Sequence, residues 1–180
     1  MRVTFDLSER DLRYFRQALK SVKRSIKAED EEVVIDGAEA LVKEVVAGQP
    51  PDFVRERMQH LDQLVAMLRD EEWRLKGADR ARVLNALAYF VDPDDIIPDR
   101  VPGIGYLDDA IMVELVCQEL KPEIEAYEDF CEFRKKRGRK VDPDALEARR
   151  VQLQSRMRRR RRRRTGSRDR GGRKSPIQLW

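Results

Sequence analysis

Apolar residues recur every three or four positions along most of the chain, the spacing that brings them onto one face of an α-helix. The first such row follows Ser8, and its members are Leu12, Phe15, Leu19, Val22 and Ile26. Two more rows follow, at Val34, Ala38, Leu41 and Val45, and at Val54, Met58, Leu61, Val65 and Leu68. Ser8 and Asp11 stand at the spacing of a capping box, which predicts that the first helix begins at Ser8. Three amphipathic helices joined by short breaks are typical of a helical bundle.

The second half of the chain continues this pattern after an interruption from Gly77 to Asp79. The apolar positions predict four more helices, which cover about 80–91, 106–120, 122–134 and 142 onward. We therefore predict an all-α fold, a small helical bundle. Its expected parts are N-terminal amphipathic helices packing on the core (1–76), a central helical domain (77–141), and a helix that runs into a basic tail (142–180).

Between the helices predicted at 80–91 and 106–120 lies a connector that reads VDPDDIIPDRVPGIGYLDDA and contains six aspartates, three prolines and two glycines. Asp92 followed by Pro93 is an N-cap with proline at the first helical position. Pro98 pushes the residue before it out of the helical region and so ends that turn. Proline and glycine further along favour additional turns. The sequence therefore predicts a rigid structural motif, formed by Asp92, Pro93, Pro98, Pro102 and Gly105.

The same aspartates allow a second interpretation, a site for a divalent cation. Carboxylates are the ligands that Mg²⁺ and Ca²⁺ prefer, and the candidate ligands are Asp95, Asp99, Asp108 and Asp109. An EF-hand loop fails here, because Ile97 stands at the position of its invariant glycine and Gly103 at that of its last glutamate. Under the structural interpretation, Asp108 and Asp109 instead stabilise the first turn of the next helix. Both interpretations stay open, and the absence of a cofactor is the simpler expectation.

The order of residues in the connector resembles the signature of the YkvA-like domain, a bacterial family of unknown function. That signature reads roughly Y-x-x-x-P-x-D-L-I-P-D-x-x-P-x-x-G-x-x-D-D, and its positions here are Tyr89, Pro93, Asp95, Ile97, Pro98, Asp99, Pro102, Gly105, Asp108 and Asp109. Ile96 replaces the usual leucine and conserves its volume. The resemblance covers about residues 83–120 and implies a small helical domain without a known activity. Many members are described as membrane-associated, with a hydrophobic segment that this sequence lacks.

Charge divides the chain unevenly. Charged residues make up 40% of its 180 positions, and the formal net charge is +4. Residues 1–147 have a net charge of −9, whereas residues 148–180 have a net charge of +13. The densest basic residues are Arg156, Arg158, Arg159, Arg160, Arg161, Arg162, Arg163 and Arg164. Because like charges repel at every helical spacing, this run is predicted to be disordered, or helical only when bound.

Polyanions are the natural partners of such a tail, and the expected contact region is 149–174. Binding of RNA or DNA without sequence preference is the first hypothesis, since no RRM, KH or zinc-finger pattern and no interleaved aromatic residue accompanies the arginines. An anionic membrane surface is the alternative partner. Docking of the arginines onto the acidic body, or a solvated tail without a dedicated partner, are the remaining possibilities.

Several classes of function find no support in the sequence. Cys117 and Cys131, with the single His60 far away, match no zinc or thioredoxin pattern. The longest uncharged stretch has nine residues, whereas a membrane-spanning helix needs about twenty apolar ones, and the N-terminus lacks a signal-peptide pattern. We expect a non-enzymatic interaction module in the cytoplasm, with peripheral contact at the inner membrane as the alternative. A divalent-metal enzyme using the connector aspartates is the third hypothesis.

Overall fold

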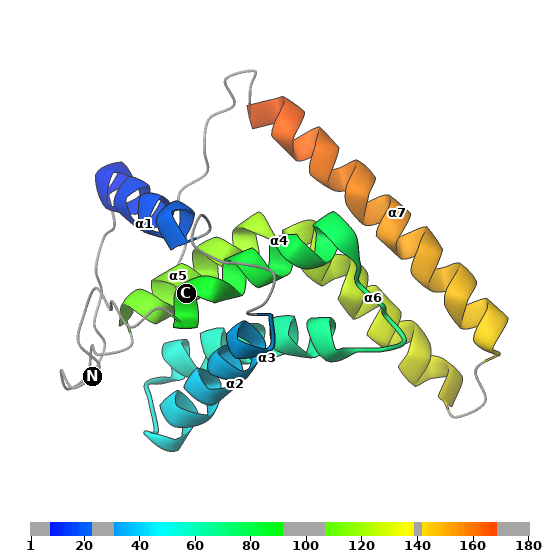
Figure 1. Cartoon of the computed structure of the whole chain (residues 1–180), viewed down its shortest axis with the longest axis horizontal. Coiled ribbons are helices and arrows are strands. Elements are labelled where there is room, and N and C mark those ends of the chain that lie inside the picture. The colour runs from blue at the N-terminus through cyan, green and yellow to red at the C-terminus, as the bar shows by residue number, and fades with distance from the viewer. Residues whose placement is uncertain (1–7, 23–30, 92–106, 139–141, 169–180) are drawn as a thin grey trace.

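Seven α-helices and one short 3₁₀ helix form the part of the chain that the computed structural model describes, residues 8–22, 31–91, 107–138 and 142–168 (Figure 1). In chain order they are α1 (Glu9–Val22), α2 (Glu31–Ala47), α3 (Asp52–Arg69), α4 (Gly77–Leu87), η2 (Ala88–Val91), α5 (Leu107–Glu119), α6 (Lys121–Arg137) and α7 (Pro143–Arg168). No strand occurs in these ranges, and the prediction of an all-α bundle is confirmed.

Local sequence signals set where several helices begin and end. The predicted capping box is present at α1, where the Ser8 amide donates to Asp11 Oδ2 (2.9 Å) and the Asp11 amide donates to Ser8 Oγ (3.3 Å). α4 begins at Gly77, earlier than the predicted 80, because Asp79 suits the first turn of a helix, where its charge is favourable. The end of that predicted helix tightens into η2. At the end of α6, Gly138 has a φ of +67°, a value that favours glycine.

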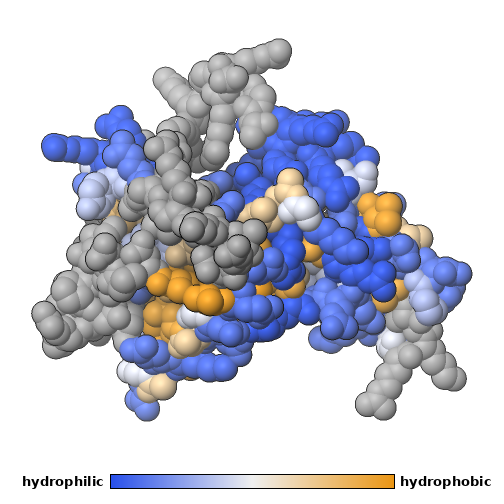
Figure 2. Space-filling view, in the orientation of Figure 1, coloured by the Kyte–Doolittle hydropathy of each residue, from blue (hydrophilic) through white to orange (hydrophobic). Residues whose placement is uncertain are grey.

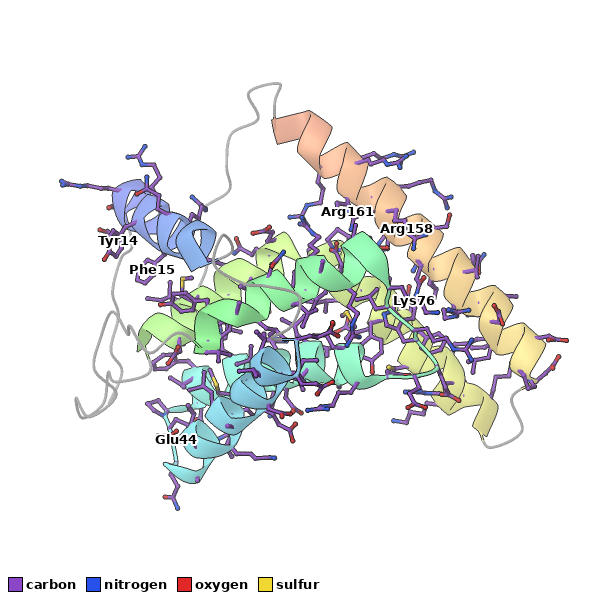
Figure 3. All side chains as sticks on the ribbon, viewed as in Figure 1. Tyr14, Phe15, Glu44, Lys76, Arg158 and Arg161 are labelled. Atoms are coloured by element: carbon purple, nitrogen blue, oxygen red, sulfur yellow. The ribbon has the colours of Figure 1, made fainter. Side chains whose placement is uncertain are left out.

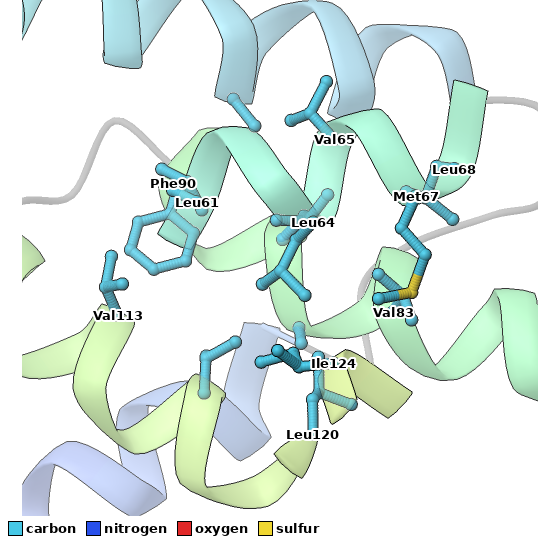
Figure 4. Close-up of a cluster of buried hydrophobic side chains, with 14 of the residues drawn as sticks. Leu61, Leu64, Val65, Met67, Leu68, Val83, Phe90, Val113, Leu120 and Ile124 are labelled. Carbon is cyan, nitrogen blue, oxygen red and sulfur yellow. The ribbon is translucent and has the colours of Figure 1, made fainter. Parts of the chain in front are cut away.

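The hydrophobic core is built around α3, on which α2, α4 and α5 pack. Figure 4 shows this cluster, in which the α3 residues are Leu61, Leu64, Val65, Met67 and Leu68. They are buried together with side chains of the later elements, namely Val83, Phe90, Val113, Leu120 and Ile124. The same cluster extends from Phe15 of α1 to Met157 of α7. Apolar side chains from both ends of the described chain therefore belong to one core.

The arginine run forms the second half of α7, which lies along α6 at the edge of the bundle (Figure 1). The predicted disorder is therefore wrong for residues 158–168, which are helical. Repulsion between neighbouring arginines favours disorder, but the structure places acidic residues of the body beside them, and these offset the repulsion. Residues 169–180, the rest of the predicted tail, lie outside the described residues.

Gly37 lets α2 approach η2 closely, and its substitution should destabilise the fold. A Cβ atom at this position would lie 2.8 Å from Val91 Cγ1, a distance at which either the Val91 side chain or the backbone of α2 or η2 must shift. In an exposed helix, alanine would be more stable than glycine by about 1 kcal/mol. Here we expect Gly37→Ala to lower the free energy of unfolding by about 1–3 kcal/mol, the usual cost of overpacking. Urea denaturation followed by circular dichroism measures this change.

Gly48→Ala is the matched control for that experiment. The nearest atom to a Cβ at Gly48 is the carbonyl oxygen of Val45, 3.4 Å away, which is an ordinary contact. We expect the control to change the free energy of unfolding by less than about 0.5 kcal/mol, as for most surface substitutions. Equal stability of the two variants would show that α2 and η2 separate without cost.

Candidate functional site

α7 docks on the body through a short apolar row. Leu153 and Met157 are fully buried, and Leu146 near the start of the helix is partly buried against the same core. Between them, the buried Gln154 donates a hydrogen bond from Nε2 to the backbone oxygen of Trp73 (2.8 Å), a residue of the segment that joins α3 to α4. These contacts fix which face of α7 points toward the body. They therefore also determine which arginines after Met157 lie on that face.

Two buried carboxylates lie beneath the arginine run. Asp79 belongs to the first turn of α4 and Glu123 to the first turn of α6, and both side chains are almost completely shielded from solvent. Arg158 Nε donates to Asp79 Oδ2 (2.7 Å), and Arg161 Nη1 lies 2.8 Å from Asp79 Oδ1 and 2.9 Å from Glu123 Oε1. Figure 3 shows both arginines projecting from α7 toward the helices below it. Arg161 therefore links the beginnings of two helices that are distant in sequence.

A third arginine, Arg82, belongs to the same cluster of ion pairs as Asp79, Glu123, Arg158 and Arg161. Arg82 of α4 donates from Nε to Glu123 Oε1 (3.1 Å) and from Nη2 to the backbone oxygen of Glu119 at the end of α5 (3.3 Å). The second carboxylate oxygen of Glu123 is buried without a hydrogen-bond partner in the described structure. Burial alone would lower the pKa of Arg161, but its hydrogen bonds to Asp79 and Glu123 raise that pKa, so its guanidinium stays charged.

A second row of arginines, one helical turn apart, pairs with α6 and with the end of α5. Arg156 forms an ion pair with Asp129, and Arg160 Nη1 lies 2.5 Å from Glu125 Oε2. One turn further on, Arg164 Nη2 donates to the backbone oxygen of Gln118 (2.8 Å). The partners run backward along the sequence as the arginines run forward, because α7 is antiparallel to α6. These pairs are more exposed than those of Asp79 and Glu123, so each contributes less to stability.

The remaining arginines of the run, Arg159, Arg162 and Arg163, are exposed, and Arg163 also borders the beginning of α6. We call these three residues the outer arginine row. Figure 2, in the same view as Figure 1, shows mainly hydrophilic side chains where α7 lies. The predicted polyanion-binding set thus contains arginines that contact carboxylate or carbonyl oxygens of the body, and the exposed outer arginine row.

Sequence reasoning missed the acidic partners of the inner arginines. The pattern predicts a break between helices at Asp79, and no local signal assigns a role to Glu123. The available signal was the net charge of −9 on residues 1–147, which made intramolecular docking one of the open possibilities. Only the tertiary arrangement shows which carboxylates are used.

The predicted metal site cannot be assembled from the described residues. Asp95 and Asp99 lie outside them, as does the side chain of Asp108, while Asp109 is buried in the first turn of α5. Asp92, Pro93, Pro98, Pro102 and Gly105 also lie outside the described residues. Within the described ranges, no group of three or more His, Cys, Asp or Glu side chains lies close enough to hold a metal ion. The cation site and the structural motif both stay predictions.

The two cysteines do not form a disulfide with each other, and the thiol of Cys117 is unreactive. Burial, with a smaller contribution from the charge of Glu114, raises the pKa of Cys117 to about 12. The Cys117 thiol is therefore protonated near neutral pH and is a poor nucleophile or metal ligand. In addition, no helix in the described part of the chain is both long and apolar enough to span a bilayer.

The fold and the site together define an all-α domain with an arginine-rich helix docked on buried carboxylates. Residues 79–115 match the family described as "Protein of unknown function (DUF1232)". The chain is also 38% identical over 79 residues to "Uncharacterized membrane protein YkvA" of Bacillus subtilis (strain 168), an alignment that covers 41% of this chain and 73% of that relative. The chain therefore belongs to the YkvA-like family, as its connector signature predicted. No solved structure matches it.

Proposed function

We propose that the protein is a non-enzymatic interaction module that binds an anionic membrane surface peripherally through the outer arginine row of α7. The observation that supports this proposal is the division of the arginines, since Arg159, Arg162 and Arg163 are exposed on one face of a helix whose other face is anchored to the body. A relative of this chain is named a membrane protein. Without a described helix that could span a bilayer, attachment by surface charge is the mode that α7 itself offers.

The physical basis of such binding is electrostatic. Each Lys or Arg held near an anionic bilayer contributes about 1 kcal/mol, and the contribution falls off within a Debye length. The only large apolar side chain exposed on the described part of α7 is Val151, so insertion of the helix into the acyl region is not part of this proposal. Three exposed arginines give modest affinity, and the sequence adds Arg168, Arg170, Arg173 and Lys174 beyond them.

RNA or DNA is the second candidate partner, favoured by the type of cation that is exposed. Guanidinium groups bind phosphate oxygens through two parallel hydrogen bonds, and this geometry occurs on nucleic acid backbones as well as on lipid headgroups. Because no aromatic side chain lies among the arginines, binding would be insensitive to base sequence and steeply dependent on salt.

A paired substitution in the outer row tests the proposed function. We expect Arg159→Gln with Arg162→Gln to weaken binding to phosphatidylglycerol vesicles by about tenfold or more, since two charges contribute about 2 kcal/mol. Vesicle flotation at about 0.15 M salt measures this, with phosphatidylcholine vesicles as the uncharged reference. Point variants are preferable to deletion of α7, because deletion would expose the core that Leu153 and Met157 cover.

The control variant Glu147→Gln with Glu44→Gln changes exposed acidic residues away from the outer row and should not weaken binding. A wild-type protein that does not float with phosphatidylglycerol vesicles contradicts the membrane proposal. If the same protein binds a single-stranded RNA homopolymer, and the outer-row variant loses that binding, nucleic acid is the partner instead.

A further inference from the structure

A surface hollow of about 520 Å³ lies where the arginine run passes the beginning of α6. The residues that line it are Lys121, Pro122, Glu125, Arg160, Arg163 and Arg164. Four of these six side chains are cationic and one is anionic, so the lining has an excess of three positive charges. Nearby on α7, Arg158 and Arg161 instead meet the carboxylates of Asp79 and Glu123. The hollow is therefore a place where positive charges of the body and of α7 converge, with only one acid among the described residues that line it.

The contacts around the hollow position its cations without using all their hydrogen-bond donors. Glu125 pairs with Arg160 (2.5 Å) and lies 3.9 Å from Lys121 Nζ, so a single carboxylate is shared by two cations. Arg164 donates one N–H group to the backbone oxygen of Gln118, and a guanidinium has five such donors. Arg163 has no hydrogen bond or ion pair to another described residue. Several donors thus remain available to a ligand in the hollow.

The local backbone adds to this positive potential. Lys121 and Pro122 are the first residues of α6, so the hollow lies at the positive end of the α6 dipole. Groups with more than one negative oxygen gain most from such a location, because they accept hydrogen bonds from several cations at the same time.

We propose that this hollow is a binding site for a phosphate monoester. A phosphate monoester has between one and two negative charges near neutral pH and three terminal oxygens, which suits three guanidinium groups and one ammonium group. A phosphate diester has one charge and two free oxygens, and it satisfies this lining less well. The site goes beyond the proposed surface binding, because a single phosphate group can occupy the hollow whether or not α7 meets a membrane.

Two pairs of substitutions with equal loss of charge test the site in the full chain. The hollow pair is Lys121→Gln with Arg163→Gln, and the control is the outer pair Arg159→Gln with Arg162→Gln. All four side chains are exposed, so both variants should fold. The first probe is inorganic pyrophosphate, titrated calorimetrically at about 0.15 M salt. The second is a comparison of vesicles containing phosphatidic acid, a monoester, with vesicles containing phosphatidylglycerol, a diester, at matched surface charge.

We expect the wild-type protein to bind pyrophosphate, the hollow pair to weaken that binding by about tenfold or more, and the outer pair to change it by less than about twofold. Equal losses in both variants, or no binding by the wild type, would overturn the site. A preference for phosphatidic acid that only the hollow pair abolishes identifies a lipid headgroup as the source of the phosphate. Pyrophosphate binding without that preference identifies a soluble phosphate compound.

The same measurements separate this inference from the proposed function. Flotation with phosphatidylglycerol vesicles, combined with no binding of pyrophosphate and no preference for phosphatidic acid, supports the membrane proposal and rejects the phosphate site. Pyrophosphate binding that the hollow pair of substitutions weakens, combined with no flotation on either lipid, supports the phosphate site and rejects the membrane proposal.

Discussion

Replacement of Glu123 by glutamine should release the arginine-rich helix and destabilise the whole domain. The Glu123 side chain has no solvent exposure, and its carboxylate faces both Arg82 and Arg161. Removing one partner of a buried ion pair costs about 3–5 kcal/mol, because the remaining charges lose their compensation. Since both arginines are partly exposed here and water offsets some of that loss, we expect Glu123→Gln to lower the free energy of unfolding by about 2–3 kcal/mol.

Two measurements test this expectation together. Urea denaturation gives the change in the free energy of unfolding, and trypsin cleavage within residues 158–164 reports whether α7 leaves the body, because trypsin cuts after arginine. Glu125→Gln is the control, since Glu125 pairs with Arg160 in a more exposed position, where ion pairs contribute less than about 1 kcal/mol. Equal stability losses in the two variants, with equal rates of cleavage, would mean that the buried cluster does not hold α7.

Trp73→Ala should produce the largest loss of stability that we foresee from a single substitution. Trp73 is fully buried, and its ring centroid lies 5.7 Å from that of Tyr127 and 5.1 Å from that of Phe130. Its backbone oxygen also accepts the hydrogen bond from Gln154 of α7. Replacing a buried tryptophan by alanine leaves a large cavity, and we expect a loss of about 3–5 kcal/mol in the free energy of unfolding, measured by urea denaturation.

Trp73→Phe separates the loss of volume from the loss of the indole N–H group. Trp73 Nε1 is buried without a hydrogen-bond partner in the described structure, so phenylalanine removes an unsatisfied donor while keeping most of the ring contacts. We expect a loss of about 1–2 kcal/mol for this variant. If Trp73→Phe were as unstable as Trp73→Ala, the indole N–H group would have a partner that the structure does not describe.

The helices and much of the core could be predicted from the sequence because they depend on local periodicity. Phe15, Met58 and Leu61 occupy positions of the apolar rows and are buried. The capping box at Ser8 is also local, since both of its partners lie within four residues. Such features need no knowledge of the rest of the fold.

The contacts of α7 with Asp79 and Glu123 could not be predicted, because they join segments that are distant in the sequence. The bond between Arg158 and Asp79 joins residues 79 positions apart, and that between Arg161 and Glu123 joins residues 38 positions apart. Repulsion among neighbouring arginines is evident in the sequence and predicts disorder. The compensating carboxylates are recognisable only in the folded structure, where Asp79 of α4 and Glu123 of α6 both contact Arg161 of α7.

Because every position from 158 to 164 is arginine, the ion pairs with Asp79 and Glu123 do not by themselves determine the register of the helix on the body. A slip by one residue rotates each side chain by about 100° around the helix axis, yet if Arg159 and Arg162 took the places of Arg158 and Arg161, arginines would still face Asp79 and Glu123. The register is instead fixed before the run, where Leu153, Gln154 and Met157 have no equivalents at neighbouring positions. Mutations at these three residues are thus the ones that would decide which arginines face outward, even though none of the three is charged.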